Sequence, residues 1–503
     1  MPAFSQIPLG TPLAASPHAV SCSLPTMADI RGYEEKDPAV TARLQTGYPR
    51  FVVHPFARRL AETLAARAGL GGRTLWLASS GRMAGSLLGH LRATPAGRGA
   101  EPFSDGGIHG ASHPLSAEAF LAAKLFLQNT GGFLPSRQAE DRLAALGGPP
   151  AGPENLFQGD AAGEVLRHLG PLFAGASAAD LTITNSGMNA VYAAFRAVND
   201  VQRPRGRTAW VQLGWLYLDT IAILRRFAPG ASDYIHVKDV MDADALAGLF
   251  RERGSSIAGV VAEVPTNPLV QTPGVAALAG LCRMHGARLI LDPSLSSAYS
   301  VDCLPHADVA VTSLTKYTAS EGDVMAGMVA VNPAGPDAGA LRGLVRDHAE
   351  ASYSRDLARL AWQVGETSRV LSAVEASTPQ VATFLEAHPA VRSVHWALSP
   401  PSRANYLALA RGPGSTGGII SFALRGDLAQ FYDRVRLPKG PSFGMKRTLI
   451  CPVMYLAHYD LVSTEVGRAE LRGNGLDPCL LRLCVGTEPA AEIIGALAEA
   501  LGG

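Results

Sequence analysis

The chain has 503 residues, 47% of them hydrophobic, and a formal net charge of +1. It is too long for one ordinary hydrophobic core, so two or three domains are expected. The near-zero charge gives no electrostatic footprint for nucleic acid or an anionic membrane, and no apolar run reaches the roughly 20 residues that span a bilayer. We therefore expect small-molecule substrates, with neither nucleic acid nor membrane as a partner.

The predictions of cellular location and metal content rest on missing targeting signals and missing metal-binding motifs. Its N-terminal region has no basic and apolar segments of a signal peptide, and no arginine precedes Arg31, so a cytoplasmic protein is expected. The six cysteines show neither C-x-x-C nor Cys/His spacing and are predicted to be free thiols, mostly in the core. The thirteen histidines contain no H-E-x-x-H pair, so no metal is predicted.

The first third of the chain mixes irregular and regular segments. Residues 1–46 are rich in proline, serine and small residues, which favours an extended arm over a packed unit. An amphipathic helix is predicted over residues 56–68 and a strand over residues 73–78. Residues 93–114 are rich in glycine and proline and are predicted to form an irregular loop, followed by a helix over residues 115–127.

A candidate anion site follows the strand predicted at residues 181–184. The turn Asn185-Ser-Gly-Met-Asn189 leads from this strand into a helix over residues 190–198. Backbone N–H groups at a helix start point toward an anion, and the helix dipole favours negative charge there. The turn therefore predicts a phosphate site formed by Ser186, Gly187 and Met188.

Strands and helices alternate from residue 181 to about 330. Strands are predicted at residues 208–213 and 257–263, and a crossover helix at 274–285 leads back to another strand at 288–292. This order predicts a doubly wound, mostly parallel sheet, whose ligands bind at the carboxyl ends of the strands. The turn Pro265-Thr-Asn-Pro268 fixes Asn267 at one such end.

Four polar side chains are expected to meet at two further strand ends. Asp292 ends one strand, and Ser313, Thr315 and Lys316 follow the next strand, at residues 308–312. Pyridoxal phosphate (PLP) needs a lysine for covalent attachment, an acid beside its ring nitrogen, and hydroxyl or N–H groups for its phosphate. All three requirements can be met within this window.

After residue 351, helical spacing carries the chain to a second domain. An alternating segment at 417–424 predicts a half-buried antiparallel strand. Arg482 lies on an apolar strand and has the side chain that grips a carboxylate in bidentate fashion, with a structural salt bridge as the alternative. We expect an N-terminal arm and extension at 1–145, a large PLP-binding domain at 146–372 and a small α/β domain at 373–503.

The succession of Asp292, Ser313-Leu-Thr-Lys-Tyr317 and the following Asp323-Val-Met-Ala-Gly327 resembles the Cys/Met-metabolism family of fold-type-I PLP-dependent enzymes. N-terminal segments such as Gly32-Tyr-Glu-Glu35 and Gly47-Tyr-Pro-Arg-Phe51 are similar to those of its fungal-type cystathionine γ-synthases. The resemblance extends from His18 to Glu488. It implies that Lys316 binds PLP, that Asp292 faces the ring nitrogen, and that Ser186, Gly187, Met188, Ser313 and Thr315 surround the phosphate.

The same resemblance assigns the substrate side of the site. It implies that Asn267 contacts the phenolic oxygen of PLP and the substrate carboxylate, and that Arg482 binds the α-carboxylate beside Ser442. Tyr217 matches the tyrosine that stacks on the ring and assists proton transfer. The two glycines that follow this tyrosine in the family are Leu218 and Asp219 here, so Trp215 is an alternative for stacking.

An arginine is expected to reach the phosphate of a neighbouring subunit's PLP. In the family a Tyr-Ser-Arg loop does this, and Arg137 stands at the arginine position, with Pro135 where the tyrosine would be. A surface arginine is the alternative reading of Arg137. Arg50 competes for the same role, although it lies much farther upstream. The resemblance implies a homodimer or homotetramer with shared active sites.

The activity that the resemblance implies is cystathionine γ-synthase, which joins L-cysteine to an O-acyl-L-homoserine. Arg447 stands where shorter bacterial enzymes carry a glutamate that is linked to substrate choice, so another γ-substitution remains open, with sulfide or with a nucleophile of secondary metabolism. A PLP-fold protein without catalysis is a third hypothesis, against which Lys316, Asp292 and Arg482 all argue.

Overall fold

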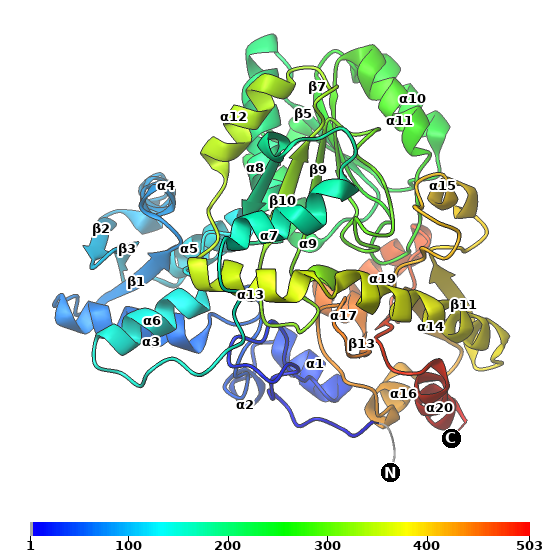
Figure 1. The fold of residues 1–503 in the computed structure, drawn as a ribbon, viewed down its shortest axis with the longest axis horizontal. Coiled ribbons are helices and arrows are strands. Elements are labelled where there is room, and N and C mark those ends of the chain that lie inside the picture. The colour runs from blue at the N-terminus through cyan, green and yellow to red at the C-terminus, as the bar shows by residue number, and fades with distance from the viewer. Residues whose placement is uncertain (1–3, 503) are drawn as a thin grey trace.

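Three β-sheets organise the protein, whose computed structural model describes residues 4–502. The N-terminal sheet has three strands, the central sheet seven and the C-terminal sheet four. Figure 1 shows the N-terminal sheet on the left, the central sheet in the middle and the C-terminal elements on the right. No helix among the described residues combines the length and the apolar character needed to cross a membrane. The six cysteines are free, and all but the half-buried Cys479 are buried, as predicted.

The central sheet has the strand order β4-β10-β9-β8-β7-β5-β6. Only β10 runs in the direction opposite to the other six strands, so the predicted mostly parallel sheet is confirmed. The strands are β4 (Leu181–Thr184), β5 (Ala209–Leu213), β6 (Tyr234–Val237), β7 (Ile257–Glu263), β8 (Arg288–Asp292), β9 (Val309–Ser313) and β10 (Gly327–Val331).

Helices cover both faces of this sheet because alternate strand residues point to opposite sides. Ile290 packs in one apolar cluster with residues of α8, α9 and α12, whereas its neighbours Leu289 and Leu291 join a second cluster that contains residues of α7, α10 and α11. The helices are α7 (Ala161–Leu169), α8 (Gly187–Gln202), α9 (Leu218–Phe227), α10 (Ala243–Arg253), α11 (Val275–His285) and α12 (Ala338–His348).

The N-terminal extension forms a small α/β unit. Its antiparallel sheet has the order β1-β3-β2, with β1 (Arg73–Ala78), β2 (Glu101–Asp105) and β3 (Ile108–Pro114). The loop predicted over residues 93–114 is therefore wrong. Gly106 and Gly107 both have positive φ and close a two-residue hairpin turn, a role that glycine pairs favour. The surrounding helices are α3 (Pro55–Arg67), α4 (Gly81–Arg92), α5 (Ala117–Thr130) and α6 (Ser136–Ala145).

The arm, defined here as residues 4–54, is packed rather than merely extended. It contains α1 (Met27–Glu34) and α2 (Pro38–Thr41), and a capping box between Thr26 and Asp29 starts α1. Leu24, Ile30 and Tyr33 are 3% exposed or less and join the main core. The expectation of an unpacked arm is wrong, because composition does not show that these scattered apolar residues share one surface.

Two long helices, α13 (Ser354–Val364) and α14 (Thr367–Ala387), lead to the C-terminal part. Its antiparallel sheet has the order β11-β12-β14-β13. The strand predicted at 417–424 is β12, which begins two residues later and is fully buried, so the predicted half-burial is wrong. The strands are β11 (Val391–Trp396), β12 (Ile419–Leu424), β13 (Leu449–Cys451) and β14 (Leu481–Cys484), and the helices are α15 (Arg403–Leu407), α16 (Leu428–Arg434), α17 (Val453–Ala457), α18 (Tyr459–Val462), α19 (Glu465–Gly473) and α20 (Ala490–Leu501).

Candidate active site

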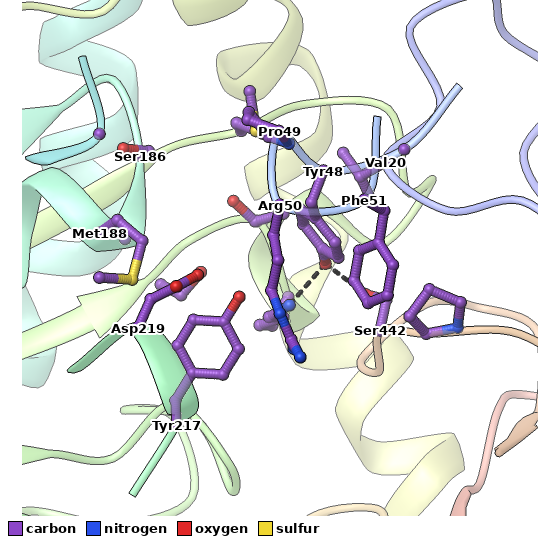
Figure 2. Close-up of a pocket in the computed structure, with 18 of the residues that line it drawn as sticks. Val20, Tyr48, Pro49, Arg50, Phe51, Ser186, Met188, Tyr217, Asp219 and Ser442 are labelled. Carbon is purple, nitrogen blue, oxygen red and sulfur yellow. Dashed lines mark hydrogen bonds between the residues drawn. The ribbon is translucent and has the colours of Figure 1, made fainter. Parts of the chain in front are cut away.

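One cavity of about 220 Å³ gathers residues from all parts of the chain. Its floor, defined here as Ser186, Asp292, Ser313 and Lys316, lies at the carboxyl ends of central strands and the start of α8. Its wall, defined here as Tyr48, Arg50 and Arg137, comes from the first 145 residues. The C-terminal part contributes Ser442 and Arg482. Figure 2 shows several of these side chains pointing into the cavity.

Asp292 and Lys316 lie on the same floor, as the sequence predicts. Asp292 accepts a hydrogen bond from the Ser294 N–H at 2.8 Å, and the Ser294 hydroxyl oxygen accepts the Ser313 N–H at 2.7 Å. Burial raises the pKa of Asp292 to about 6, while the hydrogen bonds from Ser294 and the charge of Lys316 act in the opposite direction. A buried acid of this kind fits a cationic ring nitrogen, whose charge would stabilise the carboxylate.

A second buried carboxyl, Glu263, was missed by the sequence reasoning. It ends β7 and pairs in register with Asp292 on β8. Its carboxylate accepts the backbone N–H groups of Tyr217 and, at 3.2 Å, Asn267. Burial, and then the charge of Asp292, raise the pKa of Glu263 well above its ordinary value. The sequence could have revealed Glu263, because it is an acid at the end of a buried strand next to the strand that ends at Asp292.

The predicted phosphate residues surround the start of α8. Ser186 is the N-cap, and its hydroxyl oxygen accepts the Asn189 N–H at 3.2 Å. A Cβ on Gly187 would lie 2.7 Å from the Cβ of Ser313, so only glycine allows this approach. Met188 and Thr315 also line the cavity, but the Thr315 hydroxyl is engaged with the backbone of Ala326 in its own loop.

Arg482, Asn267 and Ser442 form the substrate end. Arg482 lies on β14 and donates to the Asn267 side-chain oxygen at 3.1 Å and to the Ser442 carbonyl at 3.2 Å. These are two neutral acceptors, and guanidinium has five N–H groups, so donors remain for a carboxylate. A Cβ on Gly444 would lie 2.6 Å from the backbone nitrogen of Tyr317, so the loop after Ser442 lies directly against the lysine loop.

Of the two aromatic candidates, Tyr217 lines the cavity and Trp215 does not. Trp215 instead packs edge-on against His236 and His458, with ring centroids 5.6 Å and 5.0 Å apart. Burial raises the pKa of Tyr217 well above its ordinary value, and the charge of Asp219 acts in the same direction. Figure 2 shows Tyr217 and Asp219 side by side. Stacking by Tyr217 stays a prediction that this placement favours.

The structure places Asp219 in a buried polar position where the family has a glycine. Its carboxylate accepts hydrogen bonds from the Gln128 and Asn129 side-chain amides of α5 at 2.7 Å and 3.2 Å. Burial raises the pKa of Asp219. This residue connects the N-terminal extension to the edge of the cavity and was not assigned a role from the sequence.

Arg137 is buried among acidic residues of its own chain. It is 1% exposed, and its guanidinium pairs with Glu154 and Asp356 and donates to the Asp323 carbonyl at 2.8 Å. This burial contradicts the alternative of a surface arginine. The phosphate role of Arg137 stays a prediction, and its ion pairs within its own chain weigh against it. Its donors are already used within its own chain.

Arg50, the rival candidate, is the less engaged arginine. It is half-buried, lines the cavity and donates to the Leu456 carbonyl. Figure 2 shows its side chain extending from the arm toward Tyr217. Tyr48, two residues earlier, places its hydroxyl beside Lys316 and Ser442, a contact that the sequence reasoning did not assign. The sequence could have pointed to Tyr48, because it lies two residues before the candidate Arg50.

These features together fit PLP. A lysine and a buried acid share one floor, a helix start lies beside them for an anion, and the glycine at residue 187 allows close approach. The family model described as "Cys/Met metabolism PLP-dependent enzyme" matches residues 168–502. The chain belongs to this family. Its cofactor is PLP, and its fold is the fold-type-I architecture.

Whole-chain comparisons refine this assignment. The chain is 36% identical over 493 residues to an L-2-amino-4-chloropent-4-enoate dechlorinase/desaturase of Streptantibioticus cattleyicolor, covering 98% of both chains. It is 31% identical over 327 residues to a cystathionine γ-synthase of Neurospora crassa, covering 64% of this chain and 52% of the relative. A solved cystathionine γ-lyase of Micromonospora echinospora superposes with a TM-score of 0.56 at 24% identity, covering 67% of this chain and 86% of that one, which shows a shared fold.

Proposed function

We propose that the protein catalyses γ-elimination from a single amino acid whose Cγ carries a halide, with a substrate of the L-2-amino-4-chloropent-4-enoate type. Two observations support this. The relative of that name aligns over the arm and extension as well as the PLP-binding part. Among the described residues of this chain, the cavity also has cationic groups for one amino acid and the cofactor, but none for a second amino acid.

The main support for the proposal is the small number of positively charged side chains around the cavity. Within the described part of the chain, one lysine, three arginines and three histidines line the cavity. Burial lowers the pKa of His18 to about 2 and the pKa values of His54 and His458 to about 4, so all three are neutral at pH 7. Lys316 binds PLP, Arg482 suits one substrate carboxylate, Arg137 is paired with acids, and Arg50 remains for the phosphate.

The chemistry needs only one amino acid. Bound PLP withdraws electrons and makes the hydrogens on the substrate's Cα and Cβ acidic. Arg482 and Asn267 hold the α-carboxylate, and Lys316 is placed to accept protons from these carbons and return one. Chloride leaves Cγ with the electron pair of its bond. The net change is loss of one proton and one chloride, so no oxidant or second substrate is required.

Cystathionine synthesis from L-cysteine and an O-acyl-L-homoserine is the second candidate, supported by the Neurospora relative. It would need a cation for the cysteine carboxylate. Arg447, which marks the departure from the bacterial enzymes, does not line the cavity and donates to the Leu13 carbonyl at 3.3 Å. The single-substrate reaction is the better match to the charges of this cavity.

A substrate panel tests the proposal. Purified protein with PLP is incubated with L-2-amino-4-chloropent-4-enoate alone, and with O-acetyl- or O-succinyl-L-homoserine in the presence of cysteine, sulfide or neither. We expect chloride release and a product lighter by HCl without any added nucleophile, and none with the Lys316→Ala control. Efficient cystathionine formation together with no chloride release would contradict the proposal.

Assembly and location stay predictions. We propose a homodimer or homotetramer in the cytoplasm, as the family resemblance implies. Size-exclusion chromatography with light scattering tests the first, and a mass equal to one 52.6 kDa chain at assay concentration would contradict it.

A further inference from the structure

We propose that Phe443 is a positioning residue for the two cations that the reaction uses, Lys316 and Arg482, and that it acts through the face of its aromatic ring. The inference rests on the proposed function only in taking Lys316 as the group that binds PLP and moves protons, and Arg482 as the group that holds the α-carboxylate. It concerns the substrate end of the cavity and involves no residue of the arm.

The first observation is that both cations lie over one ring. Lys316 Nζ is 4.6 Å from the centroid of the Phe443 ring, and the guanidinium carbon of Arg482 is 5.2 Å from the same centroid. Both distances are within the roughly 6 Å at which the negative face of an aromatic ring attracts a cation. Phe443 lines the cavity but is only 8% exposed, so little water competes with this attraction.

The second observation is the left-handed backbone on both sides of Phe443. The φ angle is +97° at Ser442 and +76° at Gly444. Serine adopts such a φ at a cost in free energy, and residues of this kind are found disproportionately at functional sites. The Gly444 N–H donates to Cys484 Sγ at 3.0 Å, and the Ser442 carbonyl accepts from Arg482 at 3.2 Å. The backbone therefore fixes the place of the ring that lies between these two residues.

The third observation is the close contact between this loop and the loop of the lysine. A Cβ on Gly444 would lie 2.6 Å from the backbone nitrogen of Tyr317, so glycine allows the two backbones to approach. The rings of Phe443 and Tyr317 pack with their centroids 6.2 Å apart. The position of the Phe443 ring is thereby tied to the residue that follows Lys316.

A neutral ring suits this place because an acid would neutralise the positive charges that the reaction uses. Arg482 donates to two neutral oxygens, the Asn267 side chain at 3.1 Å and the Ser442 carbonyl at 3.2 Å, so its charge remains available to a carboxylate. Two like charges in one buried site repel each other, and a ring face beside both offsets part of this cost. Phe443 thereby fixes the position of the lysine amine relative to the guanidinium that holds the substrate.

Weakening the ring face without changing its shape provides the first test. Phe443→trifluorophenylalanine nearly keeps the size of the side chain, while the fluorine atoms withdraw negative charge from the ring face. In the holoenzyme without substrate, the pH midpoint of the visible PLP–Lys316 absorbance band should fall by at least about half a unit, because the cationic form loses a partner. Asp292 and Tyr48, two titratable groups beside Lys316, are unchanged in this variant.

Removing the ring by ordinary mutagenesis tests the effect on Arg482. The probe is L-2-aminopentanoate, a chlorine-free amino acid of the same chain length, whose binding is followed by the change in the absorbance band. Its dissociation constant should rise by roughly three- to thirtyfold in Phe443→Leu, the range for loss of a largely buried cation–π contact. Phe422→Leu is the matched control, because Phe422 is buried on β12 of the same C-terminal sheet and does not line the cavity.

The outcomes distinguish the ring face from simple packing. If the trifluorophenylalanine variant keeps the wild-type midpoint, the ring is only an apolar spacer and the inference is overturned. An unchanged dissociation constant in Phe443→Leu, or an equal rise in Phe422→Leu, would overturn it as well. A wild-type protein that binds PLP and L-2-aminopentanoate, but releases no chloride from L-2-amino-4-chloropent-4-enoate, would sink the proposed function and leave both tests of Phe443 intact.

Discussion

The floor and the wall of the cavity are built in different ways. The floor places Asp292 and Lys316 at the ends of adjacent buried strands, only 24 positions apart in the sequence. The wall brings Tyr48 to Lys316 across 268 residues and buries Arg137 among acids from distant segments. The floor thus depends on residues that lie close together in the sequence, and the wall depends on contacts between distant segments. Changing the floor should abolish the reaction, whereas changing the wall should alter stability or affinity.

The largest effect is expected at Lys316. Lys316→Ala removes the residue that we propose binds PLP covalently and carries protons, so turnover should fall below detection and the visible absorbance of the lysine-bound cofactor should disappear. Chloride release and absorbance spectra measure the two losses. Lys446→Ala is the control, because Lys446 pairs with Glu321 and does not line the cavity. Retained absorbance in Lys316→Ala would show that the floor has been misidentified.

The second largest effect is expected at Arg137, where a substitution should lower the stability of the protein. Arg137→Leu leaves Glu154 and Asp356 without their buried partner, and breaking such a pair typically costs about 3–5 kcal/mol. Thermal unfolding of the PLP-loaded protein should show a large drop in midpoint. Arg167→Leu, which removes an exposed pair with Glu164, should leave the unfolding midpoint almost unchanged. Equal midpoints for Arg137→Leu and wild type would refute the structural role.

Much of the floor could be predicted from the sequence because each part of it is local. The strands at β7 and β8 match their predicted ranges, and a lysine or acid at a strand end is placed by the strand itself. The wall could not be predicted in the same way. Arg50 and Arg137 look alike in sequence, and only the three acids that fold around Arg137 distinguish them.

The arm and the β2–β3 hairpin show the limits of composition. Both were expected to be irregular because they are rich in glycine, proline and small residues. The hairpin depends on positive φ at Gly106 and Gly107, and the arm depends on burying Leu24 and Ile30 against residues hundreds of positions away. Glu263 was missed although its place at the end of a buried strand was a signal, because the backbone N–H groups that it accepts, from Tyr217 and Asn267, approach it only in the folded chain.

A moderate effect is expected at Arg50. If Arg50 binds the phosphate of PLP, Arg50→Ala should raise the PLP dissociation constant by roughly ten- to a hundredfold, the range for loss of one charge-assisted contact. Titration of the apoprotein, followed by absorbance, measures it. Arg447→Ala should leave PLP affinity unchanged, since Arg447 does not line the cavity. If Arg50→Ala binds PLP as wild type does, the phosphate assignment is wrong.

The smallest effect concerns the pH dependence of Asp292. Burial raises its pKa in the folded protein from 3.8 to about 6, so the folded state holds this proton more tightly than the unfolded state. The stabilisation is present below about pH 4 and is lost as pH rises through about 6, on the order of 1–3 kcal/mol. Thermal unfolding of the apoprotein between pH 4 and 7 should therefore show a steeper loss for wild type than for Asp292→Asn. Identical pH profiles would contradict the burial argument.

Chloride release as a function of cysteine concentration tests the central claim most directly. With L-2-amino-4-chloropent-4-enoate as substrate, the account predicts a rate that does not depend on cysteine and a product that contains no sulfur, because we propose that the cavity accepts one amino acid beside PLP. Chloride release that requires cysteine and yields a thioether would contradict it.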